Sequence, residues 1–198
     1  MRMKWLMLGL GNPGTVYERT RHNVGFLSLE GLVRSLNGTL RKAWLHPYRS
    51  ASGYLETAPC LFVQPLTYMN RSGLILPRLM RRYNLDASSL VVFCDNMDLP
   101  TGAIRVRKGG GTAGHRGIAS VQQHLDSNEF IRIYIGIGRP ERGVSVVDHV
   151  LGVPHERDEQ LITQGIRRAE AAAAALVQFP LERVYDEFNR KDAHPAAP

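Results

Sequence analysis

Cysteine is scarce in this sequence, and its scarcity excludes several classes of site. The chain has 198 residues and two cysteines, Cys60 and Cys94, and neither belongs to a Cys-x-x-Cys pair. Zinc ribbons and dithiol redox sites need such closely spaced thiols, so neither is predicted here. Two isolated thiols suit a protein that is kept in a reducing compartment.

Long hydrophobic runs are also missing. Residues 1–10 combine positive charge with apolar side chains, but Gly9, Gly11 and Pro13 interrupt the apolar stretch. The stretch is too short for the core of a signal peptide or for a membrane span. We therefore expect a first β-strand there, and a cytoplasmic protein. The sequence has no internal repeat and no long linker, so its length predicts one domain.

Acidic residues are outnumbered by basic ones. Lys and Arg total 25 against 18 Asp and Glu, which gives a formal net charge of +7. Clustered cations bind polyanions by neutralising phosphates and releasing counterions. Charge alone therefore favours a nucleic-acid partner about as strongly as it favours a basic enzyme without one.

The distribution of apolar residues predicts strands that alternate with helices. Short apolar runs, typical of buried strands, lie at residues 5–10, 61–63, 90–94 and 131–137. Apolar and basic residues alternate at 104–107, so one face of that strand would be cationic. Helical spacing occurs at residues 24–36, 74–83 and 156–179. This order predicts an α/β domain with a largely parallel or mixed central sheet, followed by a flexible tail at residues 191–198.

A Gly-x-Gly-x-x-Gly pattern follows the first expected strand, at residues 9–14. It matches the fingerprint of dinucleotide-binding folds, which leads directly into a helix with a long apolar face. Here a polar segment, residues 15–23, follows the last glycine. The sequence therefore disfavours a nicotinamide-dependent oxidoreductase, although this alternative stays open.

Three polar side chains near expected strand ends have the chemistry of a general-base site. Asn12 lies in the turn after the first strand, Asp95 directly follows the strand at 90–94, and His22 lies in a polar segment. Open α/β sheets bind ligands at the carboxyl ends of their strands. The aspartate would orient the imidazole and raise its basicity, and the imidazole would take a proton from water. Taken singly, each residue also has an ordinary structural explanation.

The sequence contains no Gly-x-Ser-x-Gly nucleophile elbow. A bound water is therefore favoured over a serine as the attacking group.

Five segments resemble the bacterial-type peptidyl-tRNA hydrolase family, in that family's order and spacing. They are residues 9–14 (Gly-Leu-Gly-Asn-Pro-Gly), 20–25 (Thr-Arg-His-Asn-Val-Gly), 65–73, 95–100 and 108–117. The resemblance extends from about residue 3 to residue 190. It implies one catalytic domain over residues 1–190, with a twisted, mixed sheet flanked by helices on both faces. It also implies a monomer that needs no metal and no cofactor, and that acts on peptidyl-tRNA away from membranes.

The resemblance assigns roles to individual residues. His22 would be the general base, Asp95 would orient it, and Asn12 would position the substrate and separate blocked peptidyl-tRNA from aminoacyl-tRNA. The positions that would contact the tRNA end or the peptide, or line the same cleft, are Tyr17, Tyr68, Met69 and Asn70. The basic strip Arg105, Arg107 and Lys108 precedes three glycines and suits a phosphate-bearing acceptor stem, although it also fits a solvated strand face.

Two departures from the family pattern lie at positions that would bind the substrate. Arg116 stands where the family usually has a substrate-binding asparagine, and Tyr134 stands where it often has an arginine for the tRNA 5′ phosphate. Residues 112 and 113 also differ. Arginine accepts no hydrogen bond and is always charged, so Arg116 would bind a phosphate more readily than a neutral group. The chain could therefore be an RNA-binding relative of this family with weakened or lost hydrolysis. The presence of Asn12, His22 and Asp95 together argues against that alternative.

Overall fold

The computed structural model describes residues 2–190, and the strands of this part form one seven-stranded sheet. The strands are β1 (Trp5–Gly9), β2 (Arg41–Lys42), β3 (Tyr48–Leu55), β4 (Ala58–Pro65), β5 (Leu90–Asn96), β6 (Ile104–Lys108) and β7 (Ile131–Gly136). Their spatial order is β2-β3-β4-β1-β5-β7-β6. The four central strands β4, β1, β5 and β7 are parallel, whereas β2, β3 and β6 pair antiparallel at the two edges. The prediction of a mixed, largely parallel sheet is confirmed.

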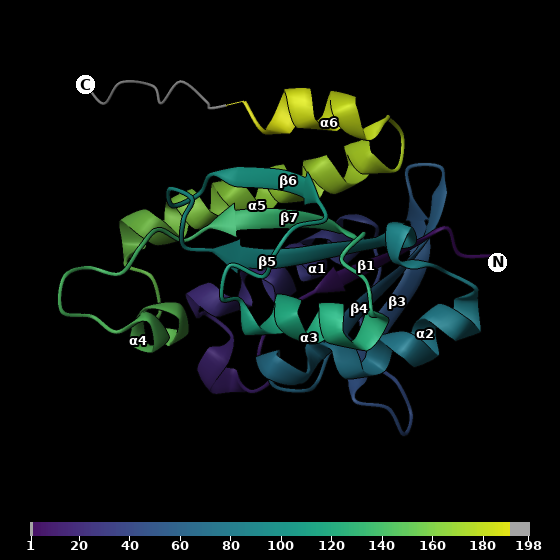
Figure 1. Ribbon diagram of the computed structural model, residues 1–198, viewed down its shortest axis with the longest axis horizontal. Helices are drawn as coiled ribbons and strands as arrows, with labels where there is room; N and C mark the ends of the chain where they lie inside the picture. Colours follow the sequence, from purple (N-terminus) through teal and green to yellow (C-terminus); the bar gives the residue numbers. More distant parts are fainter. Residues whose placement is uncertain (1, 191–198) are drawn as a thin grey trace.

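Helices cover both faces of this sheet, as the family resemblance implied (Figure 1). One face packs against α1 (Val24–Ser35), α5 (Glu156–Leu176) and α6 (Leu181–Phe188). The opposite face packs against α2 (Leu76–Tyr83), α3 (Arg116–Leu125) and the 3-10 segment η3 (Met69–Ile75). The remaining elements are α4 (Val146–Leu151), η1 (Thr15–Tyr17), η2 (Arg21–Asn23) and η4 (Ala87–Ser89).

The central strands are buried on both faces, and this explains their unbroken apolar sequences. Met7 and Phe93 belong to the apolar cluster under α1 and α5, whereas their neighbours Leu8 and Val92 belong to the cluster under α2 and α3. Successive side chains thus enter opposite layers of the core. The sheet is therefore held rigidly from both sides, and its strand ends are fixed relative to one another.

Gly25 brings the start of α1 against the ends of β1 and β5. A Cβ atom at this position would overlap the carbonyl oxygens of Leu10 and Phe93. Only glycine allows this close approach of helix and sheet. Because η2 directly precedes α1, the approach places His22 at the carboxyl end of β5.

Several elements differ from the sequence-based expectation. The helix expected at 74–83 begins as α-helix only at Leu76, because η3 precedes it. The last expected helix ends at Leu176, and α6 follows Pro180 as a separate helix that was not foreseen. Strand β3 and helices α3 and α4 were also missed. The tail expected at 191–198 lies outside the described residues, so that prediction stays untested. Within residues 2–190, no helix is long and apolar enough to cross a bilayer.

Candidate active site

A cavity of about 560 Å³ lies at the carboxyl ends of the parallel strands. Asn12 follows β1, Met69 follows β4, Asp95 lies near the end of β5, and Tyr134 lies on β7. This is the edge at which open α/β sheets bind their ligands. The N-terminus of α3 adds a second polar wall, and the side chains of Val146, Val147, Val150 and Leu151 from α4 add an apolar one.

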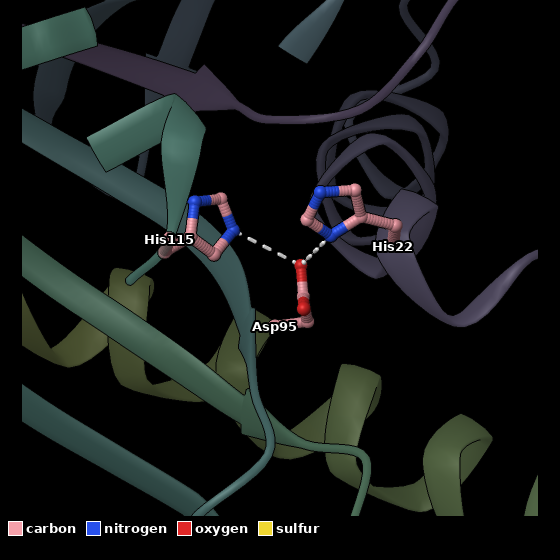
Figure 2. Close-up of side chains that lie close together, drawn as sticks. All are labelled: His22, Asp95 and His115. Carbon is pink, nitrogen blue, oxygen red and sulfur yellow. Dashed lines mark hydrogen bonds and ion pairs between the residues drawn. The ribbon is translucent and has the colours of Figure 1, made fainter. Parts of the chain in front are cut away.

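His22 and Asp95 meet in this cavity, as the sequence predicted. Nδ1 of His22 lies 2.6 Å from Oδ1 of Asp95, and the two side chains are only 13% and 4% exposed (Figure 2). An ionised carboxylate can only accept a hydrogen bond, so Nδ1 of His22 carries the proton. In the neutral ring, Nε2 of His22 is then unprotonated and is the atom able to accept a proton.

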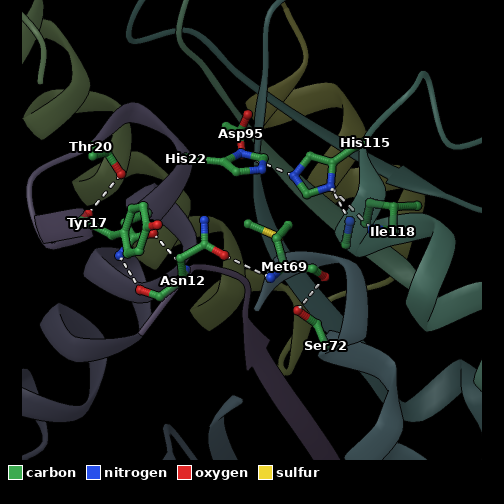
Figure 3. A network of polar contacts seen from close by, with 11 residues as sticks. Asn12, Tyr17, Thr20, His22, Met69, Ser72, Asp95, His115 and Ile118 are labelled. Carbon is green, nitrogen blue, oxygen red and sulfur yellow. Dashed lines mark hydrogen bonds and ion pairs between the residues drawn. The ribbon is translucent and has the colours of Figure 1, made fainter. Parts of the chain in front are cut away.

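A second histidine, His115, contacts the same carboxylate oxygen. Its Nε2 lies 3.0 Å from Oδ1 of Asp95, and its Nδ1 accepts the backbone N–H groups of Gly117 and Ile118 at 3.1 and 3.2 Å (Figure 3). His115 thereby caps α3. His115 lies in the family-like segment at residues 108–117, and no role was predicted for it. The helical spacing of Ile118, Val121 and Leu125 behind it is the signal that would have marked it as a cap.

The environment of Asp95 keeps its carboxylate ionised. Burial raises the pKa of Asp95, but its interactions with His115 and His22, whose rings both contact Oδ1, outweigh this and hold the pKa well below its usual range. The neighbouring thiol behaves in the opposite way, because burial raises the pKa of Cys94 well above its ordinary value. A neutral, buried thiol is a poor nucleophile, so Cys94 is not a candidate for the attacking group.

Asn12 is held so that its amide nitrogen remains available to a ligand. Its Oδ1 accepts the backbone N–H of Met69 at 2.8 Å, and its own backbone N–H and C=O are bonded to the side chain of Asn23. The nitrogen of the amide points toward His22 (Figure 3). Asn12 therefore offers a fixed, uncharged hydrogen-bond donor beside the imidazole.

The other predicted contact residues occupy different places. Tyr68 and Asn70 are exposed members of the cavity lining, and Met69 both lines the cavity and lies 4% exposed in the core. Met69 thus belongs both to the cavity wall and to the apolar core. Tyr17 lies on η1, outside the residues that line the cavity. Its predicted contact with the tRNA would have to occur beyond the cavity itself.

The basic strip on β6 has the predicted alternation. Ile104 and Val106 are buried, whereas Arg105, Arg107 and Lys108 are exposed. Arg105 lies opposite Tyr134 in the antiparallel pairing of β6 with β7. Paired residues project from the same face of a sheet, so the strip begins beside the cavity residue Tyr134.

Arg116 lies in the cavity lining, at the start of a helix and not in the turn that precedes it. It is the first residue of α3, and its side chain is exposed. The turn ends at His115, whose ring caps the helix, and Gly117 is already helical.

Two other arginines that lie close to Tyr134 in the sequence already have partners. Arg132 is fully buried and donates to the carbonyl oxygens of Gly110 and Gly111, at 2.8 and 2.6 Å, and to the hydroxyl of Tyr134 at 3.2 Å. Its guanidinium therefore holds the glycine loop in place and is not exposed to a phosphate. Arg139 forms a surface ion pair with Asp98.

Comparison with known proteins identifies the family. The family model described as peptidyl-tRNA hydrolase matches residues 6–196. The chain belongs to the peptidyl-tRNA hydrolase family. A peptidyl-tRNA hydrolase of Bacillus licheniformis is 44% identical over 183 residues, which cover 92% of this chain and 97% of the relative. The peptidyl-tRNA hydrolase of Bacillus subtilis is 43% identical, with coverages of 94% and 98%.

Solved structures of the family share the fold. The crystal structure of peptidyl-tRNA hydrolase from Acinetobacter baumannii superposes with a TM-score of 0.89 at 32% sequence identity, covering 96% of this chain and 97% of that one. The match includes nearly the whole chain, so the single-domain α/β architecture is that of the family. The dinucleotide-binding alternative is wrong, since two 3-10 segments separate the turn at residues 9–14 from α1.

Proposed function

We propose that this protein hydrolyses the ester bond between tRNA and a peptide, or an N-blocked aminoacyl group, and so releases the tRNA for reuse. Family membership supports the reaction. The observation that carries the mechanism is the 2.6 Å contact between His22 and the buried, ionised Asp95. It leaves an imidazole nitrogen free to act as a base in a cavity that also holds a fixed amide donor, Asn12.

The reaction runs through an activated water. Nε2 of His22 takes a proton from the water as its oxygen attacks the ester carbonyl carbon, and Asp95 stabilises the imidazolium that forms. The carbonyl oxygen gains negative charge, which the amide of Asn12 stabilises by donating a hydrogen bond. When the tetrahedral intermediate collapses, the ribose oxygen leaves and takes the proton from His22. No covalent enzyme intermediate forms, and the chemistry uses neither a metal nor a cofactor.

The tRNA is held by groups around the cavity. Tyr68, Asn70 and Arg116 contact the 3′ end, and Tyr17 contacts the tRNA farther out. Arg105, Arg107 and Lys108 bind phosphates of the acceptor stem, because exposed cations on a strand edge attract a polyanion at long range. The protein acts in this way as a monomer.

The second candidate function is RNA binding with weakened hydrolysis, and Arg116 is the observation that favours it. Purified protein incubated with N-acetyl-aminoacyl-tRNA separates the two, with ester loss and tRNA binding followed in parallel. We expect rapid ester loss, and much slower loss from the same tRNA with a free amino group. Tight binding without ester loss above the spontaneous rate would establish the alternative instead.

A further inference from the structure

Two imidazoles share one oxygen of Asp95. His22 approaches Oδ1 at 2.6 Å through Nδ1, and His115 approaches the same Oδ1 at 3.0 Å through Nε2. The ring centroids lie 5.0 Å apart, and the planes are tilted by 44°. Figure 2 shows the two rings meeting at the carboxylate from opposite sides, one from η2 and the other from the start of α3. The proposed mechanism uses only the first of these rings.

The start of α3 fixes the tautomer of His115. Its Nδ1 lies 3.1 Å from the backbone nitrogen of Gly117 and 3.2 Å from that of Ile118. A backbone N–H can only donate, so Nδ1 must present a lone pair. In a neutral imidazole the proton is then on Nε2, which donates it to Asp95. Protonation at Nδ1 would break both hydrogen bonds to the start of the helix.

This tautomer argues against a metal site at the same three residues. His22, Asp95 and His115 each bring one potential ligand atom within 4.8 Å of the others, which resembles a two-histidine, one-carboxylate set. A metal would need the lone pair of Nε2 of His115. With Nδ1 already accepting from the helix, the ring would have to lose both protons and become an anion. A hydrogen bond from Nε2 to the carboxylate satisfies every atom without that cost.

We propose that His115 is a positioning residue that shares the negative charge of Asp95 with His22 and thereby sets the pH at which His22 becomes a free base. This inference rests on the proposed function, because it concerns the base of that reaction. Each N–H donated to Oδ1 stabilises the carboxylate. Because His115 also donates to Oδ1, the Asp95 carboxylate stabilises the His22 imidazolium less strongly. The His22 imidazolium then loses its proton at a lower pH than it would beside a carboxylate that accepted a hydrogen bond from His22 alone.

Other charged groups near His22 have partners of their own or are exposed to solvent. In the cavity lining, Asp98 pairs with Arg139, the Tyr134 hydroxyl accepts from Arg132, and Tyr68 and Arg116 are exposed. On the neighbouring elements, Arg21 of η2 bonds to Asp158, Asp148 of α4 accepts from Ser145, and His149 of α4 bonds to the carbonyl oxygen of Gly138. On α1, Glu30 pairs with Arg49. The hydrogen bonds from His115 and His22 are therefore the main interactions of the Asp95 carboxylate.

The first test replaces the donor and keeps the helix cap. Serine is a preferred N-cap residue but is too short to reach Asp95, so His115→Ser retains the cap and loses the hydrogen bond. His124→Ser is the matched control, because His124 lies on the same helix and bonds to the carbonyl oxygen of Ser120, away from the cavity. The pH dependence of kcat/KM is measured with N-acetyl-aminoacyl-tRNA for the parent and for both variants.

We expect the ascending limb of the profile to move to higher pH by roughly one unit in His115→Ser. The plateau at high pH should stay within about twofold of the parent, and His124→Ser should follow the parent throughout. A purely structural role would lower the rate at every pH and leave the midpoint in place. An unmoved midpoint in His115→Ser would overturn the proposal.

The second test needs neither activity nor a variant. Nitrogen-15 NMR of the histidine rings in the parent protein reports which nitrogens carry protons across the pH range. We expect His115 to keep a proton on Nε2 and none on Nδ1 while His22 titrates. A protonated Nδ1 in His115, or titration of His115 together with His22, would contradict the inference. If the parent failed to hydrolyse the ester, the proposed function would fall, and this measurement would still decide the state of His115.

Discussion

Arg116 places a permanent cation at the first residue of α3, where the helix gains nothing from it. The N-terminus of a helix carries partial positive charge and favours anions by about 0.3–1 kcal/mol. A cation there is mildly unfavourable, and the side chain lies in the cavity lining. Together the helix end and the guanidinium favour a phosphate at this side of the cavity.

Two substitutions test the role of Arg116. Arg116→Asn should retain hydrolysis, or raise it, and should weaken the salt dependence of tRNA binding, because asparagine binds without charge. Arg116→Glu should raise the dissociation constant for tRNA by about tenfold, since it sets like charge against phosphate. Filter binding and ester hydrolysis at low salt measure both effects. If both variants matched the parent, Arg116 would be a solvent-facing residue without a role.

The position of a single site residue was predictable from the sequence only where the residue follows a recognisable strand or turn. Asn12 and Asp95 follow apolar runs, so their places at the strand ends were evident, whereas the role of His22 was implied by the family resemblance. The contact of His115 with Asp95 joins residues 20 apart through the start of an unforeseen helix, and no local pattern reports it. The burial of Arg132 was not predictable, because arginine is rarely buried without an acidic partner and this one is held by backbone carbonyls.

At the scale of elements, the start of α1 must lie against the sheet for His22 to reach Asp95. Gly25→Ala should destabilise the protein by roughly 1–3 kcal/mol, because the added methyl group meets the carbonyl oxygens of Leu10 and Phe93. Gly111→Ala is the control, since a Cβ there has nothing within 4 Å. Urea unfolding of both variants gives the comparison. Equal stabilities would mean that α1 can shift away from the sheet, and that its close approach does not fix His22.

Strand β6 should contribute to tRNA affinity and leave the chemistry unchanged. Replacing Arg105 and Arg107 together with alanine should raise KM for full-length tRNA substrates and reduce the salt dependence of binding, by about one unit of slope per lost phosphate contact. Arg41→Ala with Lys42→Ala is the matched control, because β2 carries two exposed cations at the opposite edge of the sheet.

The turnover of a minimal ester that lacks the tRNA body should be the same for both double variants of this strand test. An equal rise of KM in the β2 control would show that only overall charge matters. A loss of rate on the minimal ester would show that β6 shapes the cavity.

The central strands and α1 were predictable because burial on both faces, or on one helical face, leaves a regular apolar pattern. Strand β3 was missed because it lies near an edge and carries polar residues such as Arg49, Ser50 and Ser52. Helices α4 and α6 are short. The apolar side chains of α4 line the cavity, which exists only in the folded chain. Helix α4 therefore has no buried stripe, and in α6 the stripe consists of only two buried residues, Val184 and Phe188, which is too short a pattern to reveal a helix.

At the scale of the whole molecule, the sheet order brings together residues that are far apart in the chain. Strand β1 pairs with β4 on one side and with β5 on the other. Asn12, Met69 and Asp95 therefore meet at one edge, although the chain between them spans more than eighty residues. The net charge of +7 favours the approach of a polyanion, and Arg105 and Arg107 of β6 lie on the face that carries the cavity residue Tyr134.

The most direct test of water activation by His22 is the single-turnover rate on N-acetyl-aminoacyl-tRNA, with enzyme in excess, for the parent and for His22→Ala. When the enzyme concentration is also well above the dissociation constant, the rate does not depend on binding and reports the chemical step alone. We predict a loss of about 10²–10⁴-fold in His22→Ala, with tRNA affinity and unfolding midpoint unchanged. A variant that cleaved the ester at the parental rate would contradict the assignment of His22 as the general base.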